Sequence, residues 1–132
     1  MLVVDASVMV MLAAGGPGSE EADRMVEGAV LAAPELVLAE AANALWRKAR
    51  VGSITHAEAV KAAKGIGPMF ARLVPLRVLR DRALDLALRR DHPAHGCFYV
   101  ALAVREAAPL LTADRRVAQR FGGDVEVRLP TA

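Results

Sequence analysis

The chain has 132 residues, of which 55% are hydrophobic, and its formal net charge is +2 at pH 7. This length favours one domain covering residues 1–132, able to bury a core without disulfide bonds or a structural metal. The single cysteine, Cys97, excludes an intrachain disulfide framework and fits a reducing, cytoplasmic environment.

The first predicted strand, residues 2–4, is an apolar run that ends directly before Asp5, and a helix-compatible stretch follows it. This apolar start has no preceding Lys or Arg and contains Asp5, so we expect no signal peptide. No apolar run is long enough to cross a bilayer, so we expect no membrane contact. Ser19, followed by acidic residues, predicts a helix start, residues 30–34 predict a second strand, and Pro34 opens a helix that ends at Gly52.

The second half of the chain begins with a capping-box sequence at residues 55–58, which predicts another helix. Gly65, Gly67 and Pro68 should kink or interrupt that helix. The remaining predicted elements are a strand at 73–78, helices at 80–90 and 96–107, a strand at 109–114, a helix at 115–121 and a closing segment at 125–129.

Strands that are separated by helices predict an α/β fold with three layers, a central parallel sheet flanked by helices on both faces. Ligands of such sheets bind outside the carboxyl ends of the strands. Asp5 and Asp114 each follow a predicted apolar strand and therefore lie at that edge.

Glu40 lies within an apolar predicted helix and shares one face with Asn43 and Arg47. Taken alone, it is explained by pairing with Arg47 or by solvation. Together with Asp5 and Asp114, however, it would bring three acids to one cleft, where they repel each other. A divalent cation resolves that conflict, and hard oxygen ligands select Mg²⁺ or Mn²⁺ over zinc.

Residues 91–103 place His92, His95 and Cys97 close together at a predicted helix start. These side chains are possible zinc ligands, but a structural zinc site needs four, and the only other histidine, His56, lies in an unrelated segment. A helix cap and the remnant of a different site therefore stay open as alternatives.

Four stretches of the chain resemble the signature blocks of the PIN domain family, in its VapC-type toxin branch. They are VVDASV at 3–8, PELVLAEAANALWRKARVG at 34–52, HPAHGCFYVALA at 92–103 and PLLTADRRVA at 109–118, in the expected order over nearly the whole chain. The resemblance implies a PIN fold, metal-dependent endoribonuclease activity on RNA, a homodimer, and neutralisation by a small antitoxin whose tail covers the active site.

Carried over by resemblance, the catalytic and metal-binding acids are Asp5, Glu40 and Asp114, with Mg²⁺ or Mn²⁺ as the cofactor. The candidate supporting residues are Ser7, Asn43, Thr112 and His95.

The third block departs from the family pattern. Relatives usually read HPAYDCLYLALA, so Gly96 replaces an aspartate and His95 replaces a tyrosine. We therefore expect a weakened metal site and reduced activity. The main alternative is a degenerate PIN domain that binds RNA or antitoxin without cleavage. A flavodoxin-like receiver is a weaker alternative, because no acidic pair follows the first strand and Glu40 would have no role.

Overall fold

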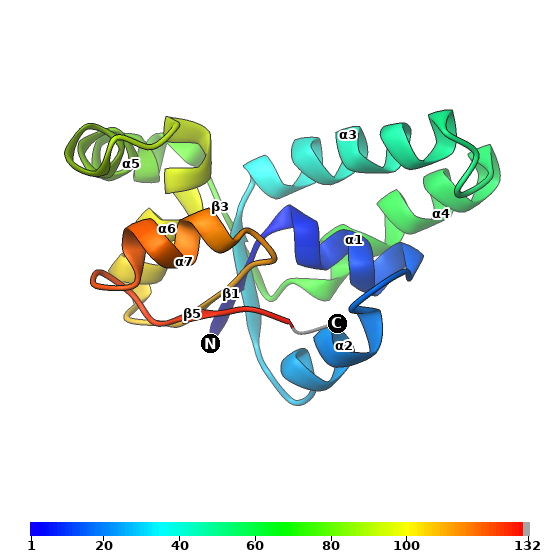
Figure 1. The fold of residues 1–132 in the computed structure, drawn as a ribbon, viewed down its shortest axis with the longest axis horizontal. Coiled ribbons are helices and arrows are strands. Elements are labelled where there is room, and N and C mark those ends of the chain that lie inside the picture. Colours follow the sequence, from blue (N-terminus) through cyan, green and yellow to red (C-terminus); the bar gives the residue numbers. More distant parts are fainter. Residues whose placement is uncertain (131–132) are drawn as a thin grey trace.

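The computed structural model describes residues 1–130, in which five parallel strands form a sheet between two layers of helices (Figure 1). The strands, in chain order, are β1 (Leu2–Val4), β2 (Leu31–Pro34), β3 (Arg72–Val74), β4 (Leu110–Leu111) and β5 (Val127–Arg128). The predicted α/β architecture with a central parallel sheet is therefore confirmed.

The helices divide between the two faces of the sheet. On one side lie α1 (Ala6–Ala14), α2 (Ser19–Val26), α3 (Leu36–Arg50) and α4 (His56–Ile66), and on the other lie α5 (Leu76–Arg90), α6 (Ala94–Glu106) and α7 (Arg115–Phe121) (Figure 1). A short 3₁₀ turn, Gly67–Met69, follows α4. Among the helices of residues 1–130, none combines the length and the apolar character needed to cross a bilayer.

The core lies where the sheet meets these helices. Every residue of β1 and β2 is buried, which explains why these strands are continuous apolar runs and not alternating patterns. Met9 of α1, Leu45 of α3 and Phe121 of α7 are among the largest fully buried side chains. Phe121→Ala should cost about 3–5 kcal/mol of folding free energy through the cavity it leaves.

The strand order, β3-β2-β1-β4-β5, creates a switch point between β1 and β4. The chain builds β1, β2 and β3 outward in one direction and then crosses over to the other side of β1 to make β4. Val3 pairs with Leu110 and Val4 with Leu111, so the two strands end together. The crevice beyond these two carboxyl ends is where open α/β sheets bind their ligands.

Two predicted boundaries near prolines are wrong. The strand expected at 73–78 stops at Val74, and α5 starts at Leu76, because Pro75 has no N–H for sheet pairing and instead precedes the helix. The helix expected from Pro34 starts at Leu36, because Pro34 is still paired with Val74 at the end of β2.

Two further boundaries differ beside the cleft. The helix expected at 96–107 begins at Ala94, directly after Pro93, so position 96 lies in the first turn of α6. The strand expected at 109–114 is confined to Leu110–Leu111, because the chain then turns into α7 with Asp114 as its N-cap. Gly96 and Asp114 therefore both lie at helix starts, where they face the crevice.

Candidate active site

A cleft with a volume of about 490 Å³ lies at the carboxyl ends of β1 and β4. The three predicted acids Asp5, Glu40 and Asp114 all line it, and Gly96 forms part of its wall. Asp5 follows β1, Glu40 comes from α3 and Asp114 follows β4. Elements from both sides of the sheet therefore bring these carboxylates to one place.

Asp5 is held entirely by neutral hydrogen-bond donors. It is the N-cap of α1, and its Oδ1 accepts hydrogen bonds from Ser7 Oγ at 2.5 Å and from the backbone N–H of Val8 at 3.3 Å. Its Oδ2 accepts a hydrogen bond from the Thr112 hydroxyl. These donors orient the carboxylate without neutralising its charge.

Burial raises the pKa of Asp5 above its ordinary value of 3.8. The hydrogen bonds from Ser7 and Thr112 oppose that rise, and the negative charge of Glu40 adds to it. An acid held in this way is more costly to ionise than one in water, unless a cation shares the site. The Asp5 side of the cleft therefore has the electrostatics of a cation site.

Glu40 is oriented by two residues of α6. Its Oε1 accepts a hydrogen bond from the Tyr99 hydroxyl at 2.5 Å, and its Oε2 lies 3.3 Å from His95 Nδ1. Burial raises the pKa of Tyr99 far above its ordinary value of 10, and the hydrogen bond to Glu40 adds to this rise, so the hydroxyl stays a donor.

The sequence analysis did not select Tyr99 and missed this contact. Tyr99 is indeed buried, but its hydroxyl reaches the cleft. The available signal was a lone tyrosine within an apolar helix, since a buried phenol needs a hydrogen-bond partner.

Asp114, unlike Asp5, has a cationic partner. It is the N-cap of α7, where its Oδ1 accepts a hydrogen bond from the Arg116 backbone N–H at 2.9 Å. The Arg116 guanidinium also donates to both carboxylate oxygens at 3.2 Å. Burial alone would raise the pKa of Asp114, but the hydrogen bonds and charge of Arg116 outweigh it and lower that pKa.

Two hydroxyl groups connect the acids. Thr112, which is fully buried, donates to Asp5 and accepts a hydrogen bond from the Asp114 backbone N–H at 3.0 Å. Ser7 donates to Asp5 and accepts from the Ala113 backbone N–H at 3.1 Å. The loop after β4 is thus tied to the start of α1 through Asp5.

Of the two remaining predicted supporting residues, His95 lies in the cleft and Asn43 does not line it. His95 is exposed but lines the cleft beside Glu40, whereas Asn43 is exposed on α3 and is absent from the cleft lining within residues 1–130. Arg47, considered as a partner of Glu40, also lines the cleft. The Glu40 carboxylate, however, is engaged by Tyr99 and His95.

Comparison with known proteins assigns a family to this arrangement. The family model described as PIN domain matches residues 2–122. The chain belongs to the PIN domain family. Over 124 residues it is 37% identical to the ribonuclease VapC3 of Pyrobaculum aerophilum, covering 91% of this chain and 94% of that protein.

Solved structures show the same PIN fold. The structure of VapC20 from Mycobacterium tuberculosis, described as a sarcin-ricin loop cleaving toxin, matches with a TM-score of 0.75 at 23% identity, covering 97% of this chain and 99% of that one. The structure of a toxin–antitoxin complex from Klebsiella pneumoniae matches with a TM-score of 0.68 at 16% identity, covering 99% and 98%.

The wall of this PIN domain at Gly96 is occupied by His92. A Cβ atom at position 96 would lie 3.0 Å from His92 Cε1, closer than side chains normally pack, and at an ordinary 3.6 Å from His92 Nδ1. The ring is held in place by an edge-on contact with Phe121, with centroids 5.3 Å apart, and its Nδ1 lies 3.2 Å from the Pro93 carbonyl oxygen. His92, which the sequence analysis considered only as a possible zinc ligand, therefore fills the space beside Gly96.

The zinc hypothesis has no support in this geometry. Cys97 is buried, and burial raises the pKa of its thiol to about 11, so in the metal-free protein the thiol keeps its proton at neutral pH. Within residues 1–130, no group of three or more His, Cys, Asp or Glu side chains stands ready to hold a metal ion.

A pair of oxygen donors nevertheless fits a hard divalent cation. The Asp5 carboxylate is buried without a cation and senses the charge of Glu40, while Asp114 is engaged by Arg116. The donor chemistry suits Mg²⁺ or Mn²⁺, which prefer carboxylate oxygens. Asp5 and Glu40 could hold such an ion, and Asp114 could join them once Arg116 moves away.

Proposed function

We propose that this PIN domain is a metal-dependent endoribonuclease and the toxin of a toxin–antitoxin pair, with Asp5, Glu40 and Asp114 as its acidic site. The observation that carries the proposal is the Asp5 carboxylate, buried among neutral donors and destabilised by Glu40. Such an arrangement costs folding free energy and is typical of functional sites. The similarity to VapC3, which is named a ribonuclease, supplies the reaction class.

Divalent-metal dependence is general among PIN nucleases, and the oxygen donors of this cleft favour Mg²⁺ or Mn²⁺. A bound ion would lower the pKa of a water molecule and stabilise the charge that develops on the phosphodiester. Asp5 and Glu40 would hold it. Ser7, Thr112 and Tyr99 orient these carboxylates, as residues around metal ligands commonly do.

Arginines on the cleft wall would bind the RNA backbone. Arg47 and Arg116 line the cleft from α3 and α7, which lie on opposite faces of the sheet (Figure 1). Phosphate groups are the ligands that such guanidinium groups prefer, through paired charge-assisted hydrogen bonds. If a phosphate binds Arg116, it would also weaken the hold of Arg116 on Asp114.

The partner proteins in this proposal are an antitoxin and a second copy of the chain. The similarity to the toxin of the Klebsiella pneumoniae complex supports an antitoxin. Several large apolar side chains are exposed in the isolated chain, among them Trp46, Val51, Leu84 and Leu88. Exposed apolar surface of this kind favours protein contacts. A cytoplasmic location would keep the lone Cys97 reduced.

Cleavage of a single-stranded RNA with Mn²⁺ or Mg²⁺ tests the enzymatic proposal. We expect product bands that disappear with excess chelator and in Asp5→Asn. Cleavage that persists in Asp5→Asn would refute the acidic site.

A second candidate, a PIN domain that binds RNA without cutting it, is favoured by one observation. Position 96 is a glycine against which the His92 ring packs, so this part of the wall supplies no carboxylate. RNA that is bound but uncut over the full range of metal concentrations would establish this candidate and exclude the first.

A further inference from the structure

The cleft continues beyond the acids along α7. Asp114 is the N-cap of this helix, and Arg116, Gln119 and Arg120 of the helix also line the cleft. Gln119 lies five residues after Asp114 in the sequence, which is about 7.5 Å along the helix axis. The same end of the cleft is lined by residues 91–93, the turn between α5 and α6. This end therefore offers space for a part of the substrate that is not at the acids.

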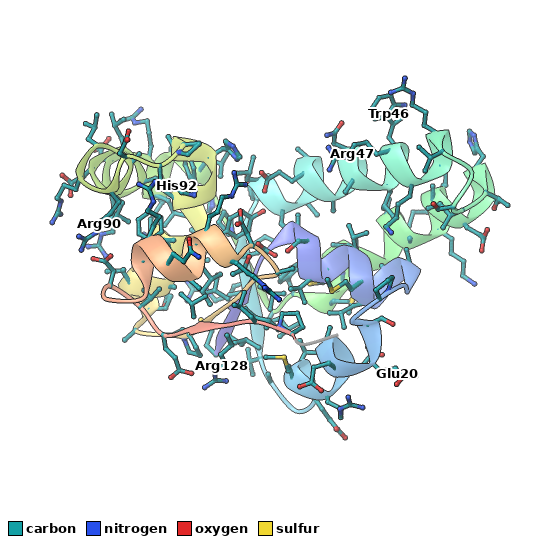
Figure 2. All side chains as sticks on the ribbon, viewed as in Figure 1. Glu20, Trp46, Arg47, Arg90, His92 and Arg128 are labelled. Carbon is teal, nitrogen blue, oxygen red and sulfur yellow. The ribbon has the colours of Figure 1, made fainter. Side chains whose placement is uncertain are left out.

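The turn between α5 and α6 is held against α7. Arg120 Nη1 donates to the Arg90 and Asp91 carbonyl oxygens, at 2.7 and 3.1 Å. The Arg90 guanidinium donates to both carboxylate oxygens of Asp124, at 3.2 and 3.0 Å, and the His92 ring packs edge-on against α7. Figure 2 shows Arg90 and His92 on the α7 side of the molecule, away from α3. A turn fixed by these contacts is preorganised, as a specific binding site requires.

Asp91 is an unusual residue for its position in this turn. It is the C-cap of α5 with a φ of 51°, in the left-handed region where glycine and asparagine are favoured. The negative end of the helix dipole also disfavours a carboxylate there. Within residues 1–130, no hydrogen bond or ion pair engages this carboxylate, since Arg120 binds the Asp91 carbonyl oxygen and Arg90 pairs with Asp124. A residue that breaks local rules without a partner in the fold is a candidate for binding a ligand.

An acid at this end of the cleft also opposes the binding of RNA phosphates, which the arginines of the cleft attract. The repulsion is offset if the carboxylate accepts hydrogen bonds from a base. Guanine presents two adjacent donors, N1–H and the N2 amino group, on its Watson–Crick edge, and these match the two oxygens of a carboxylate. Adenine, cytosine and uracil have no such pair of neighbouring donor atoms. The chemistry of the carboxylate therefore selects guanine.

We propose that Asp91 recognises a guanine base bound at the α7 end of the cleft, beside the phosphate held at the acids. The two carboxylate oxygens accept from N1–H and from the N2 amino group, and His92 and Pro93 line the space next to them. The inference rests on the proposed ribonuclease function, because it assigns a base preference to the same RNA. Asp91 is a specificity-determining residue in this proposal and does not touch the reacting phosphate.

Oligoribonucleotides that differ in one base test this preference. The full chain carrying Asp5→Asn would be titrated with labelled oligouridylates that contain one central guanosine, inosine or adenosine. Inosine keeps N1–H but lacks the N2 amino group. We expect the guanosine oligonucleotide to bind about tenfold more tightly than the adenosine one, with inosine between them, because hydrogen bonds to a charged acceptor are among the stronger ones. Equal affinities for the three would overturn the assignment.

Asp91→Asn, in the same background, distinguishes recognition of a base from a structural role. Asparagine suits the left-handed backbone, so this variant should be at least as stable as its parent. It offers one acceptor in place of two and carries no charge. We expect the preference for guanosine to fall to about twofold or less, while the adenosine oligonucleotide binds about twofold more tightly because a repulsive charge is gone.

Asp81→Asn is the matched control for this substitution. Asp81 is an exposed acid of α5 and is not among the residues of 1–130 that line the cleft. The control removes the same charge and should keep the preference for guanosine. A preference that survives in Asp91→Asn, or that is lost equally in Asp81→Asn, would overturn the proposal.

Cleavage separates this proposal from the ribonuclease assignment. If the wild type cleaves an RNA of mixed sequence, the cuts should lie next to guanosines, and in Asp91→Asn they should spread to other bases. Selective binding of guanosine without any cleavage would retain the base site and refute the nuclease. Cleavage at all bases alike in the wild type would retain the nuclease and refute the base site.

Discussion

The two aspartates that follow neighbouring strands of the sheet have opposite environments. Asp5, after β1, is buried among neutral donors and its pKa is raised. Asp114, after β4, receives the Arg116 guanidinium and its pKa is lowered. The positions look equivalent in the topology, because β1 and β4 end side by side. Arg116 thus neutralises the Asp114 half of the cleft, whereas the Asp5 half, held by neutral donors, is the one that we propose a cation completes.

This asymmetry suggests an order of events in the proposed enzyme. The Asp5 and Glu40 half would bind the cation first, because the donors that hold Asp5 are all neutral. The Asp114 half would be released when an RNA phosphate binds Arg116. Thr112 links the halves, since it donates to Asp5 and accepts from the Asp114 backbone.

The largest expected effect is that of Asp5→Asn. We expect RNA cleavage to fall by about 10³-fold or more, because the amide cannot hold the cation whose charge stabilisation is worth several kcal/mol. We also expect the metal-free variant to be more stable than the wild type at pH 7, by about 1 kcal/mol or roughly 3–5 °C in Tm, since the amide carries no charge to desolvate. Cleavage assays and thermal melts with a chelator present measure both effects.

The stability gain expected from Asp5→Asn should depend on pH. Folded Asp5 binds its proton more tightly than the unfolded chain, whose ordinary pKa is 3.8. The stability linked to this proton is present below pH 3.8 and is lost as the pH rises through the folded pKa. The gain from Asp5→Asn should therefore appear only above that range. Asp23→Asn, at an exposed acid of α2, is the control, and a lower Tm for Asp5→Asn at pH 7 would contradict the account.

Tyr99→Phe should have the second largest effect. Removing the hydroxyl takes away the donor that orients Glu40 Oε1. Changes of this kind next to a metal ligand typically cost 10–100-fold in metal affinity or activity, and we expect about tenfold here because water can reach the partly exposed Glu40. Mn²⁺ calorimetry measures the loss, with Phe98→Leu on the same helix as control. Unchanged affinity would mean that Tyr99 only packs.

Arg116→Gln addresses the other half of the cleft. It removes the cation from Asp114 and leaves the backbone N-cap bond in place. We expect Mn²⁺ to bind about threefold more tightly and single-stranded RNA more weakly, because this contact is largely exposed and exposed pairs contribute little. The opposite changes in the two affinities distinguish this residue from Arg115, whose substitution by Gln should weaken RNA binding alone. Weaker Mn²⁺ binding in Arg116→Gln would contradict the proposed competition.

Sequence reasoning located the sheet and the three acids because both depend on local patterns. Apolar runs followed by Asp5 and Asp114 indicate strand ends, and the parallel topology brings such ends together. The sequence could not distinguish the two aspartates, because the burial of Asp5 and the contact of Arg116 with Asp114 arise only in the folded cleft. Tyr99 was misjudged for a similar reason: the direction of its hydroxyl depends on how α6 packs against α3.

The smallest expected effect is that of Gly96→Asp, which restores the aspartate whose absence, by the family resemblance, should weaken the metal site. An acid in the first turn of α6 is favoured by the helix dipole. However, its Cβ would lie 3.0 Å from His92 Cε1, so the ring must shift before the carboxylate can reach the cleft.

A double-mutant cycle separates these two effects. We expect about a twofold gain in Mn²⁺ affinity from Gly96→Asp alone, and a larger gain once His92→Ala makes room for the new side chain. His92→Ala alone is the control, since it loses the contact with Phe121 and should lower Tm without adding a ligand. A positive coupling measured by calorimetry would mean that the His92 ring limits how well a carboxylate at position 96 reaches the cation. If Mn²⁺ affinity were the same in all four proteins, Asp5 and Glu40 would define the cation site by themselves, and the wall at Gly96 would have no part in it.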